Sequence, residues 1–412
     1  MEIITLKNKI RIVLEYIPYL RSVSLGFWIK NGSRNETAAQ SGISHFTEHM
    51  LFKGTKNRSA KDIADQIDRI GGQINAFTTK EFTCYYTRTL DKDLPKGFDI
   101  LSDMLLNSLF DQEEIDKERN VILEEINMYE DNPEDVASDL MQYSVWEGHS
   151  LGYPVLGTRD TISKFTTHTF KDYLAANYNP EKIVISIAGN FDESQVMDLV
   201  NSLNEYTNPP LRGERTLAKY QKSIALKTKD IEQVHLQLGF ESINYKSDYI
   251  YTMAALNAIL GGSMSSYLFQ SIREERGLAY SVYSYQNSYE DTGLFSICVG
   301  LVKENVEPVI DLVQKEITQL KAGKITKEQL EKTKAQLTGN YILSLESSGS
   351  RMNSIGRTLI TLDRVLTPDQ IIEKIDEINL DKIYDLSNLL DLSQMSISAV
   401  GDLDGLDFNQ WT

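Results

Sequence analysis

The alternation of apolar and polar positions predicts a mixture of strands and helices along the chain. Residues 3–6 and 10–16 alternate around a Lys-Asn-Lys turn and predict a hairpin, and the apolar run 22–29 predicts a buried strand. Helical spacing at 41–52 and 60–70 predicts two helices, the second of them stopped by a Gly-Gly pair. The same two periods predict strands at 73–79, 81–90 and 183–189, helices at 95–108, 112–130 and 134–146, and a helix that ends near 203.

Three short segments of the first half recur in the second half at nearly the same offset. Residues 25–27 (Leu-Gly-Phe) recur at 238–240, an offset of 213, and residues 114–117 resemble 329–332, an offset of 215. The segment around Gly189 resembles the segment around Gly401, an offset of 212. Each match is weak alone, but their agreement suggests a duplication. We therefore predict one half at 1–207, a Pro- and Gly-containing linker at 208–222, and a homologous half at 223–412.

Composition and charge exclude some classes of protein. The chain has 412 residues, 41% hydrophobic and 25% charged, which is ordinary for a globular protein with a large core. The net charge of −17 argues against nucleic acid as the main partner, and it fits either a cationic substrate or simply a soluble surface. The two cysteines, Cys84 and Cys298, imply no disulfide framework. No signal peptide or membrane span is predicted, so the cytoplasm is the expected compartment.

Candidate chemistry is concentrated at residues 44–52, which contain His-x-x-Glu-His. Because helical residues turn by about 100°, His45 and His49 would lie about 40° apart, with Glu48 about 60° to one side of His45. Two imidazoles spaced in this way can bind one zinc ion, and the carboxylate beside them can take a proton from zinc-bound water. This order of residues is the signature of inverted zinc peptidases. The alternative is two surface histidines on an ordinary helix.

The predicted helix at 112–130 supplies candidates for a third metal ligand. Its apolar stripe centres on Ile122, and Glu118 and Glu125 would fall on the same margin of that stripe, about 40° and 60° from Ile122. Glu124 would point away, toward water. Glu125 is therefore the better ligand, and Glu118 is either a helper one heptad earlier or an ordinary surface glutamate.

The duplicated half does not retain these residues. The positions offset from His45, His49, Glu118 and Glu125 hold small or neutral side chains: Ala258, Gly262, Thr333 and Asn340. The first half is therefore expected to hold the metal, and the second half is expected to do something else.

The motif at 45–49, followed 76 residues later by Glu125, resembles the pitrilysin/insulinase family of zinc peptidases. The similarity is closest to the β-subunit of mitochondrial processing peptidase and its bacterial relatives, and it extends to Phe-Lys-Gly-Thr at 52–55, Asn-Ala-Phe-Thr at 75–78 and Arg273-x6-Tyr280. The resemblance implies an α+β fold of two duplicated halves, each a largely antiparallel sheet with helices packed on it, that enclose a chamber. It also implies one Zn2+ per chain, proteolysis inside the chamber, and a homodimer.

The resemblance implies roles for individual residues. His45, His49 and Glu125 match the zinc ligands, Glu48 matches the general base, and Glu118 matches a helper glutamate. A second group matches the edge strand to which substrate adds as a further strand, held by its backbone hydrogen bonds; this group is Asn75, Ala76 and Phe77.

Two further pairs carry implied roles in substrate contact. Arg273 and Tyr280 match the pair from the second half that contacts the substrate carbonyl; the alternatives are an ordinary ion pair and a core tyrosine. Asp135 and Asp139 match the acidic positions that hold an arginine two residues before the cut. Their i, i+4 spacing places both on one helix face, and the alternative is two solvated acids. The glycine-rich partner of processing peptidases has only a short counterpart at 260–265, which favours a self-sufficient homodimer.

We therefore expect a zinc endopeptidase that acts on short or unstructured, preferably basic peptides, with no nucleic-acid or membrane partner. One alternative is a non-catalytic binding or assembly subunit of a processing-peptidase-type complex, because some relatives have lost catalysis. Those relatives usually lose ligands, whereas all the ligands are present here. The other alternative is a metal-dependent hydrolase of a non-peptide substrate.

Overall fold

The computed structural model describes residues 3–208 and 216–411, which form two compact units. The first unit comprises residues 1–127, 153–215 and 343–367, and the second comprises 128–152, 216–342 and 368–412. Residues 209–215 of the predicted linker at 208–222 lie outside the described residues. The predicted division into homologous halves at 1–207 and 223–412 stays a prediction. The compact units differ from these halves because residues 128–152 belong to the second unit and residues 343–367 belong to the first.

The first unit is built on a six-stranded sheet, counted among its described residues, in the order β1-β2-β6-β3-β5-β4. All neighbouring strands are antiparallel except β2 and β6. The central strands β3 and β6 are apolar on both faces, so the sheet is covered on both sides. The strands are β1 (Ile3–Thr5), β2 (Arg11–Tyr16), β3 (Ser22–Ile29), β4 (Gln73–Thr78), β5 (Thr83–Leu90) and β6 (Ile183–Gly189).

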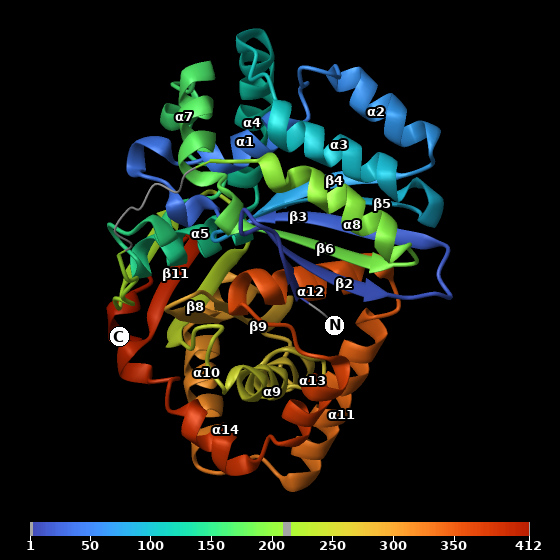
Figure 1. Cartoon of the computed structure of the whole chain (residues 1–412). Helices are drawn as coiled ribbons and strands as arrows, with labels where there is room; N and C mark the ends of the chain where they lie inside the picture. The colour runs from blue at the N-terminus through green and yellow to red at the C-terminus, as the bar shows by residue number, and fades with distance from the viewer. Residues whose placement is uncertain (1–2, 209–215, 412) are drawn as a thin grey trace. The chain divides into compact units, whose positions relative to one another are not determined.

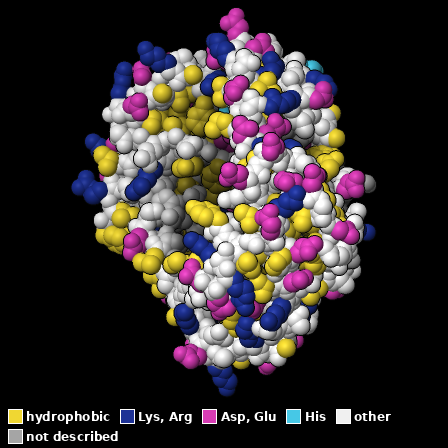
Figure 2. All heavy atoms as spheres, turned by 180° about the vertical axis from the view of Figure 1, so that it is seen from behind, with side chains coloured by type: hydrophobic (Ala, Val, Ile, Leu, Met, Phe, Trp, Pro, Cys, Tyr) yellow, Lys and Arg dark blue, Asp and Glu magenta, His cyan; other side chains and the backbone are white. Residues whose placement is uncertain are grey.

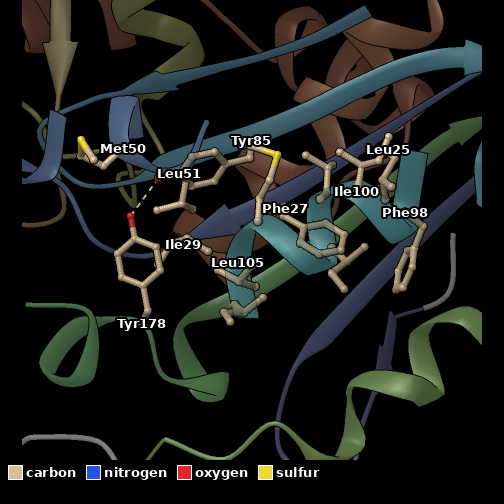
Figure 3. Close-up of a cluster of buried hydrophobic side chains, with 14 of the residues drawn as sticks. Leu25, Phe27, Ile29, Met50, Leu51, Tyr85, Phe98, Ile100, Leu105 and Tyr178 are labelled. Carbon is tan, nitrogen blue, oxygen red and sulfur yellow. Dashed lines mark hydrogen bonds between the residues drawn. The ribbon is translucent and has the colours of Figure 1, made fainter. Parts of the chain in front are cut away.

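Helices on one face of this sheet enclose its main core. Figure 3 shows Leu25 and Phe27 of β3 against Phe98 of α3, and the ring centroids of Phe27 and Phe98 are 5.5 Å apart. In the same core the hydroxyl groups of Tyr85 and Tyr178 form a hydrogen bond of 3.1 Å. The helices of this unit are α1 (Ile43–Leu51), α2 (Ala60–Arg69), α3 (Leu94–Asn107), α4 (Gln112–Asp131, which runs on into the second unit), α6 (Arg159–Ile162), α7 (Thr167–Asn177), α8 (Glu193–Asn201) and α12 (Ser348–Leu362).

The second unit is built on a five-stranded sheet, counted among its described residues, in the order β7-β11-β8-β10-β9. Its strands are β7 (Ile224–Thr228), β8 (Val234–Ser242), β9 (Ser281–Ser288), β10 (Gly293–Leu301) and β11 (Ser396–Gly401). Its helices are α5 (Pro133–Val145), α9 (Ile250–Leu260), a π-helical segment (Phe269–Glu274), α10 (Val306–Lys321), α11 (Lys327–Ser344), α13 (Pro368–Asp376) and α14 (Leu380–Ser387).

The two sheets share one topology, which agrees with the duplication predicted from sequence. β2, β6, β3, β5 and β4 correspond in order to β7, β11, β8, β10 and β9, and the single parallel pair recurs as β11 with β7. Gly26 in β3 and Gly239 in β8 occupy equivalent places, as the offset of 213 requires. The predicted α+β class with two largely antiparallel halves is therefore confirmed.

One pair of helices is exchanged between the halves. Helix α5, from the first half of the sequence, packs on β8 and β11 of the second sheet, and α12, from the second half, packs on β3 and β6 of the first (Figure 1). The two helices are themselves equivalent, because α5 begins at Pro133 and α12 at Ser348, an offset of 215. Each half therefore completes the core of the other half's sheet.

Small residues let the exchanged helices approach the strands closely. A Cβ on Gly356 of α12 would lie 2.2 Å from Nε1 of Trp28, whose indole donates to Ser186 Oγ at 2.8 Å. The strands also contribute a glycine to this close approach, at equivalent places in the two sheets. A Cβ on Gly26 of β3 would lie 2.4 Å from the sulfur of Met352 in α12, and a Cβ on Gly239 of β8 would lie 2.6 Å from the sulfur of Met141 in α5. In each sheet, the exchanged helix therefore packs against a strand at a glycine, which is Gly26 of β3 in the first sheet and Gly239 of β8 in the second.

The surface carries its charge in a dispersed form. Figure 2 shows Asp and Glu side chains spread among Lys and Arg on one face, rather than gathered in one patch. Both cysteines are buried and free, in agreement with the prediction that they form no disulfide framework. None of the described helices combines the length and the apolar character needed to cross a membrane.

Substitution of Gly356 by alanine should lower the stability of the first unit by about 1–3 kcal/mol, because the new methyl group overlaps the rigid indole of Trp28. Gly339→Ala is the matched control, since Gly339 also lies inside a helix but a Cβ there meets nothing within 4 Å. That control should be neutral or stabilising by up to about 1 kcal/mol. Urea-unfolding midpoints measure both, and equal effects would contradict the close approach of α12.

Candidate metal centre

Helix α1 carries the metal-binding motif and is fixed at its N-terminus by a buried carboxylate. Gly42, the residue before the helix, adopts a left-handed conformation (φ 93°) and offers no side chain to cap it. Glu36 takes that place, accepting hydrogen bonds from the backbone N–H groups of Gly42 and Ser44, both at 2.8 Å. The positive end of the helix dipole favours an acidic group at this position. Glu36 therefore fixes where the motif begins.

The apolar face of α1 fixes its rotation. Phe46 is fully buried and meets Phe170 of α7 edge-on, with ring centroids 5.0 Å apart. Ser44 shares a 2.6 Å hydrogen bond with Tyr173 of α7, which also accepts from Asn31 at 2.7 Å. Because this face is occupied, the opposite arc of the helix, which holds the polar residues of the motif, turns toward α4.

Two histidines of α1 and one glutamate of α4 converge there. The distance from Nε2 to Glu125 Oε2 is 3.7 Å for His45 and 3.8 Å for His49. One ligand atom from each of these three residues lies within 4.8 Å of the other two. Burial and the neighbouring His49 lower the pKa of His45 to about 3, so its ring is neutral and able to bind a metal at neutral pH.

Glu118 holds His49 from behind. Its Oε1 lies 2.9 Å from Nδ1 of His49, which leaves Nε2 of that ring on the side of Glu125. Lys53 approaches the other oxygen of Glu118 at 2.5 Å. Burial raises the pKa of Glu118, but the hydrogen bonds from His49 and Lys53 outweigh it and leave the pKa below its usual value. Glu118 is thus buried and charged, and the surface alternative considered for it is excluded.

Glu48 lies beside the three converging groups and is also largely buried. Its Oε2 accepts a hydrogen bond from the hydroxyl of Thr78, the last residue of β4. Burial raises the pKa of Glu48, and the hydrogen bond from Thr78 and the nearby His49 partly oppose that rise. A raised pKa makes a carboxylate a stronger base, so that it takes up a proton more readily.

The donor set fits a zinc ion. Two imidazole nitrogens and one carboxylate oxygen are the three protein ligands of a common type of catalytic zinc site, which keeps a further position open for water or substrate. The hydrogen bond between Glu118 and His49 is the outer support that such a ligand usually has. Among the described residues this is the one cluster of three histidine, cysteine or acidic groups close enough to hold a metal ion.

The structure brings Asn75, Ala76 and Phe77 to an exposed edge of the first sheet. They lie in β4, which pairs on one side with β5 and ends the strand order. Helix α1 packs against β4, so the strand runs beside the candidate metal centre. Addition of a peptide strand at this edge stays a prediction.

Asp135 and Asp139 lie on α5 and share one half-buried face. Asp135 accepts a hydrogen bond from Asn132 at 2.6 Å, and burial raises its pKa. Burial and the charges of Asp139 and Asp135 raise the pKa of Tyr129, which places both carboxyl groups near that hydroxyl. They are thus not freely solvated acids, although their role in binding arginine stays a prediction.

Arg273 and Tyr280 lie in the second unit and are both exposed. The guanidinium of Arg273 sits 4.9 Å from the ring centre of Phe269, and no ion pair of Arg273 is found among the described residues. Tyr280 is 77% exposed and comes directly before β9. The alternatives of an ion pair and a core tyrosine are therefore excluded, and contact with a substrate carbonyl stays a prediction.

Three residues that support the centre were missed by the sequence analysis: Glu36, Lys53 and Thr78. Lys53 and Thr78 lie in the segments 52–55 and 75–78 that carried the family resemblance, and this resemblance could have pointed to both residues. Glu36 lies in a 3-10 and turn region before α1 and carried none. In the second unit, Ala258 lies in α9, Gly262 lies just after that helix and Asn340 lies in α11. These positions, which are equivalent to the three ligands, form no metal-binding cluster among the described residues.

Glu118→Ala should weaken zinc binding by about ten- to a hundredfold, because His49 loses the acceptor that orients it and Lys53 loses its counter-charge. Glu124→Ala is the matched control, since Glu124 is an exposed glutamate on the same helix. Competition with a chromophoric chelator measures both affinities. Equal affinities for the two variants would contradict the supporting role of Glu118.

Glu36 should make stability depend on pH. Burial raises its pKa from 4.5 to about 7, despite the hydrogen bonds from Ser44 and Gly42. The folded protein then binds more protons than the unfolded chain between these values, so this group's contribution to stability is complete at low pH and is lost as pH rises through 7. Relative to Glu36→Gln, metal-free wild-type protein should lose stability on the order of 3 kcal/mol between pH 5 and pH 8. A difference that stays constant in urea unfolding at the two pH values would contradict this.

Comparison with known proteins agrees with this geometry. Residues 11–159 match the family "Insulinase (Peptidase family M16)", and residues 164–337 match "Peptidase M16 inactive domain". The chain is 42% identical over 396 residues to an uncharacterized zinc protease, YmxG, of Bacillus subtilis (strain 168), covering 96% of this chain and 97% of the relative. It is 38% identical over 409 residues to an uncharacterized zinc protease of Streptomyces coelicolor, covering 97% and 89%.

Solved structures share the fold over nearly the whole chain. A protease from Helicobacter pylori matches with a TM-score of 0.88 at 22% identity, covering 97% of this chain and 99% of that one. A structure described as peptidase M16 inactive domain, from Pseudomonas fluorescens, matches with a TM-score of 0.91 at 19% identity, covering 97% and 98%. The resemblance seen in the sequence is thereby confirmed at the level of the family, and the chain belongs to the M16 (insulinase) family of peptidases.

Proposed function

We propose that this protein is a zinc-dependent endopeptidase that hydrolyses short or unstructured, preferably basic peptides. The observation that carries the proposal is the convergence of His45, His49 and Glu125 beside the buried carboxylate of Glu48. Family membership supports peptide hydrolysis, and the intact ligand set argues against a subunit that has lost catalysis.

The proposed mechanism uses Glu48 as the group that moves the proton. A zinc ion held by the three ligands would polarise the scissile carbonyl and the attacking water. Glu48 takes a proton from that water as the water oxygen attacks the carbonyl carbon. It then delivers the proton to the nitrogen of the leaving amine as the C–N bond breaks. The raised pKa of Glu48 favours the first of these transfers, the uptake of the proton. Glu118 and Lys53 keep His49 in one orientation throughout.

The substrate side of the proposal rests on β4 and on α5. An extended peptide that adds to the edge at Asn75–Phe77 would be held by its backbone, which favours chains without stable structure. Asp135 and Asp139 are proposed to select a basic side chain near the cut, and the net charge of −17 would favour the approach of cationic peptides. Arg273 and Tyr280 are proposed to steady the substrate carbonyl.

Three further properties belong to this proposal: enclosure of the site in a chamber and a homodimer, which the family resemblance implies, and the cytoplasmic location expected from the sequence. A processing-peptidase-like preference for arginine two residues before the cut is a fourth. Sedimentation of the purified chain tests the homodimer, and the peptide experiment below tests the preference.

Digestion of a mixed peptide library by wild type and by Glu48→Gln protein tests the proposal. Wild type loaded with zinc should cut, and the variant should bind zinc equally and lose at least about a thousandfold in activity, because it has no group to accept the proton. Cut sites and rates are measured by mass spectrometry. Asp135→Asn/Asp139→Asn is the variant for specificity, and it should keep cutting while losing the preference for arginine.

Each result bears on a different part of the proposal. Full activity of Glu48→Gln would remove the assigned base. Cuts that show no preference for arginine would keep the peptidase and discard the acidic pocket. An absence of any zinc-dependent cut would favour a non-catalytic binding subunit, or a hydrolase of a non-peptide substrate.

A further inference from the structure

Thr78 connects two parts of the site that the proposed function treats separately. It is the last residue of β4, in register with Thr83 of β5, and its hydroxyl donates to Oε2 of Glu48 on α1. Asn75 to Phe77, the proposed substrate edge, precede it in the same strand. One hydrogen bond therefore joins the strand that would hold the peptide to the side chain that would move the proton.

The alternation of β4 explains why Thr78 faces the helix. Successive side chains of a strand point to opposite faces of the sheet. Phe77 lies on the face covered by α12, where its ring meets Trp28 at 5.7 Å. Ile74 and Ala76 pack against the core on the opposite face, which is the face that α1 covers. Thr78 follows the same alternation, so its hydroxyl reaches Glu48.

The hydrogen bond restricts a side chain that is otherwise free to turn. The terminal torsion of a glutamate is broad and roughly two-fold, so an unattached carboxylate samples many orientations. Thr78 occupies Oε2, and the other oxygen, Oε1, has no hydrogen-bond partner among the described residues. Thr78 thereby presents one defined oxygen to the reacting water. A general base must lie within about 2.6–3.2 Å of the proton it takes, so this orientation matters for rate.

We infer that Thr78 is a positioning residue, which orients the Glu48 carboxylate and fixes it relative to a peptide added at β4. This inference rests on the proposed function. Substrate backbone and proton acceptor then share one rigid support, and a shift of β4 moves both together. A misplacement of about 1 Å between reacting groups can cost about a hundredfold in rate. The hydrogen bond between Thr78 and Glu48 should therefore affect kcat rather than substrate affinity.

Thr78→Val, which keeps the shape and removes the hydroxyl, and Thr78→Ser, which keeps the hydroxyl, form the test. In Thr78→Val the kcat for a library-derived peptide should fall about ten- to a hundredfold, with KM changed by less than about twofold. Thr78→Ser should restore kcat to within about threefold of wild type. Zinc content and the unfolding midpoint should be the same in all forms.

The matched control is Thr89→Val in the same sheet. Thr89 is buried in β5, its hydroxyl donates to a backbone carbonyl at 3.0 Å, and it pairs with Val23. It stands six positions along β5 from Thr83, roughly 20 Å from the end of β4 where Thr78 lies. This variant should keep the wild-type kcat. A fall in kcat equal to that of Thr78→Val would reduce the effect to a general loss of sheet packing and overturn the inference.

A second measurement does not depend on activity. Hydrogen exchange of metal-free protein should be faster in Thr78→Val than in wild type for peptides covering 73–79 and 43–52, and Thr78→Ser should match wild type. Unchanged exchange, or a kcat that Thr78→Ser fails to restore, would overturn the inference. If exchange responds as expected but wild type shows no zinc-dependent cleavage, the proposed function fails and Thr78 is only a structural link.

Discussion

The candidate metal centre depends on the two backbone hydrogen bonds that Glu36 accepts at the start of α1. A nine-residue helix that begins at a left-handed glycine has no intrinsic reason to start at that position or to point in that direction. The buried carboxylate supplies that constraint, and the loop that carries it is fixed in turn by a buried ion pair between Arg34 and Glu81 at 2.8 Å. Burying charge is costly, and this chain accepts the cost where the position of a helix decides its chemistry.

Around that fixed helix, two groups of the site, His49 and Glu48, are held by other side chains. Glu118 and Lys53 orient His49, and Thr78 contacts Glu48. Glu125, at 42% side-chain exposure, is the most open member of the three candidate ligands. The site is thus rigid on the side of α1 and accessible on the side of α4, an arrangement that suits binding of a metal and entry of a peptide.

The sequence contained much of this site because helical geometry is local. The angles between His45, Glu48 and His49 follow from residue spacing, and the choice of Glu125 over Glu124 follows from one apolar stripe. Glu36 and Thr78 could not be found in this way, because their partners depend on how loops and strands fold back onto α1. Helix α7 was missed as well; its Thr- and His-containing start lacks a clear apolar period, although Phe170 and Tyr173 are buried. The exchange of α5 and α12 was equally hidden, since an amphipathic pattern indicates that a face is buried but not against which sheet.

That exchange has a consequence for how the protein can be made. Ribosomes synthesise the chain from its N-terminus, and domains usually fold as they emerge. Here the sheet behind helix α1 lacks its covering helix until residues 348–362 have been synthesised, long after the last strand of that sheet, which ends at Gly189. Until then Val13, Trp28 and Val184 have no apolar partner from α12. The core of the first unit is therefore completed only after most of the second unit has been synthesised, and a chain truncated before residue 348 leaves an apolar sheet face open to chaperones and proteases.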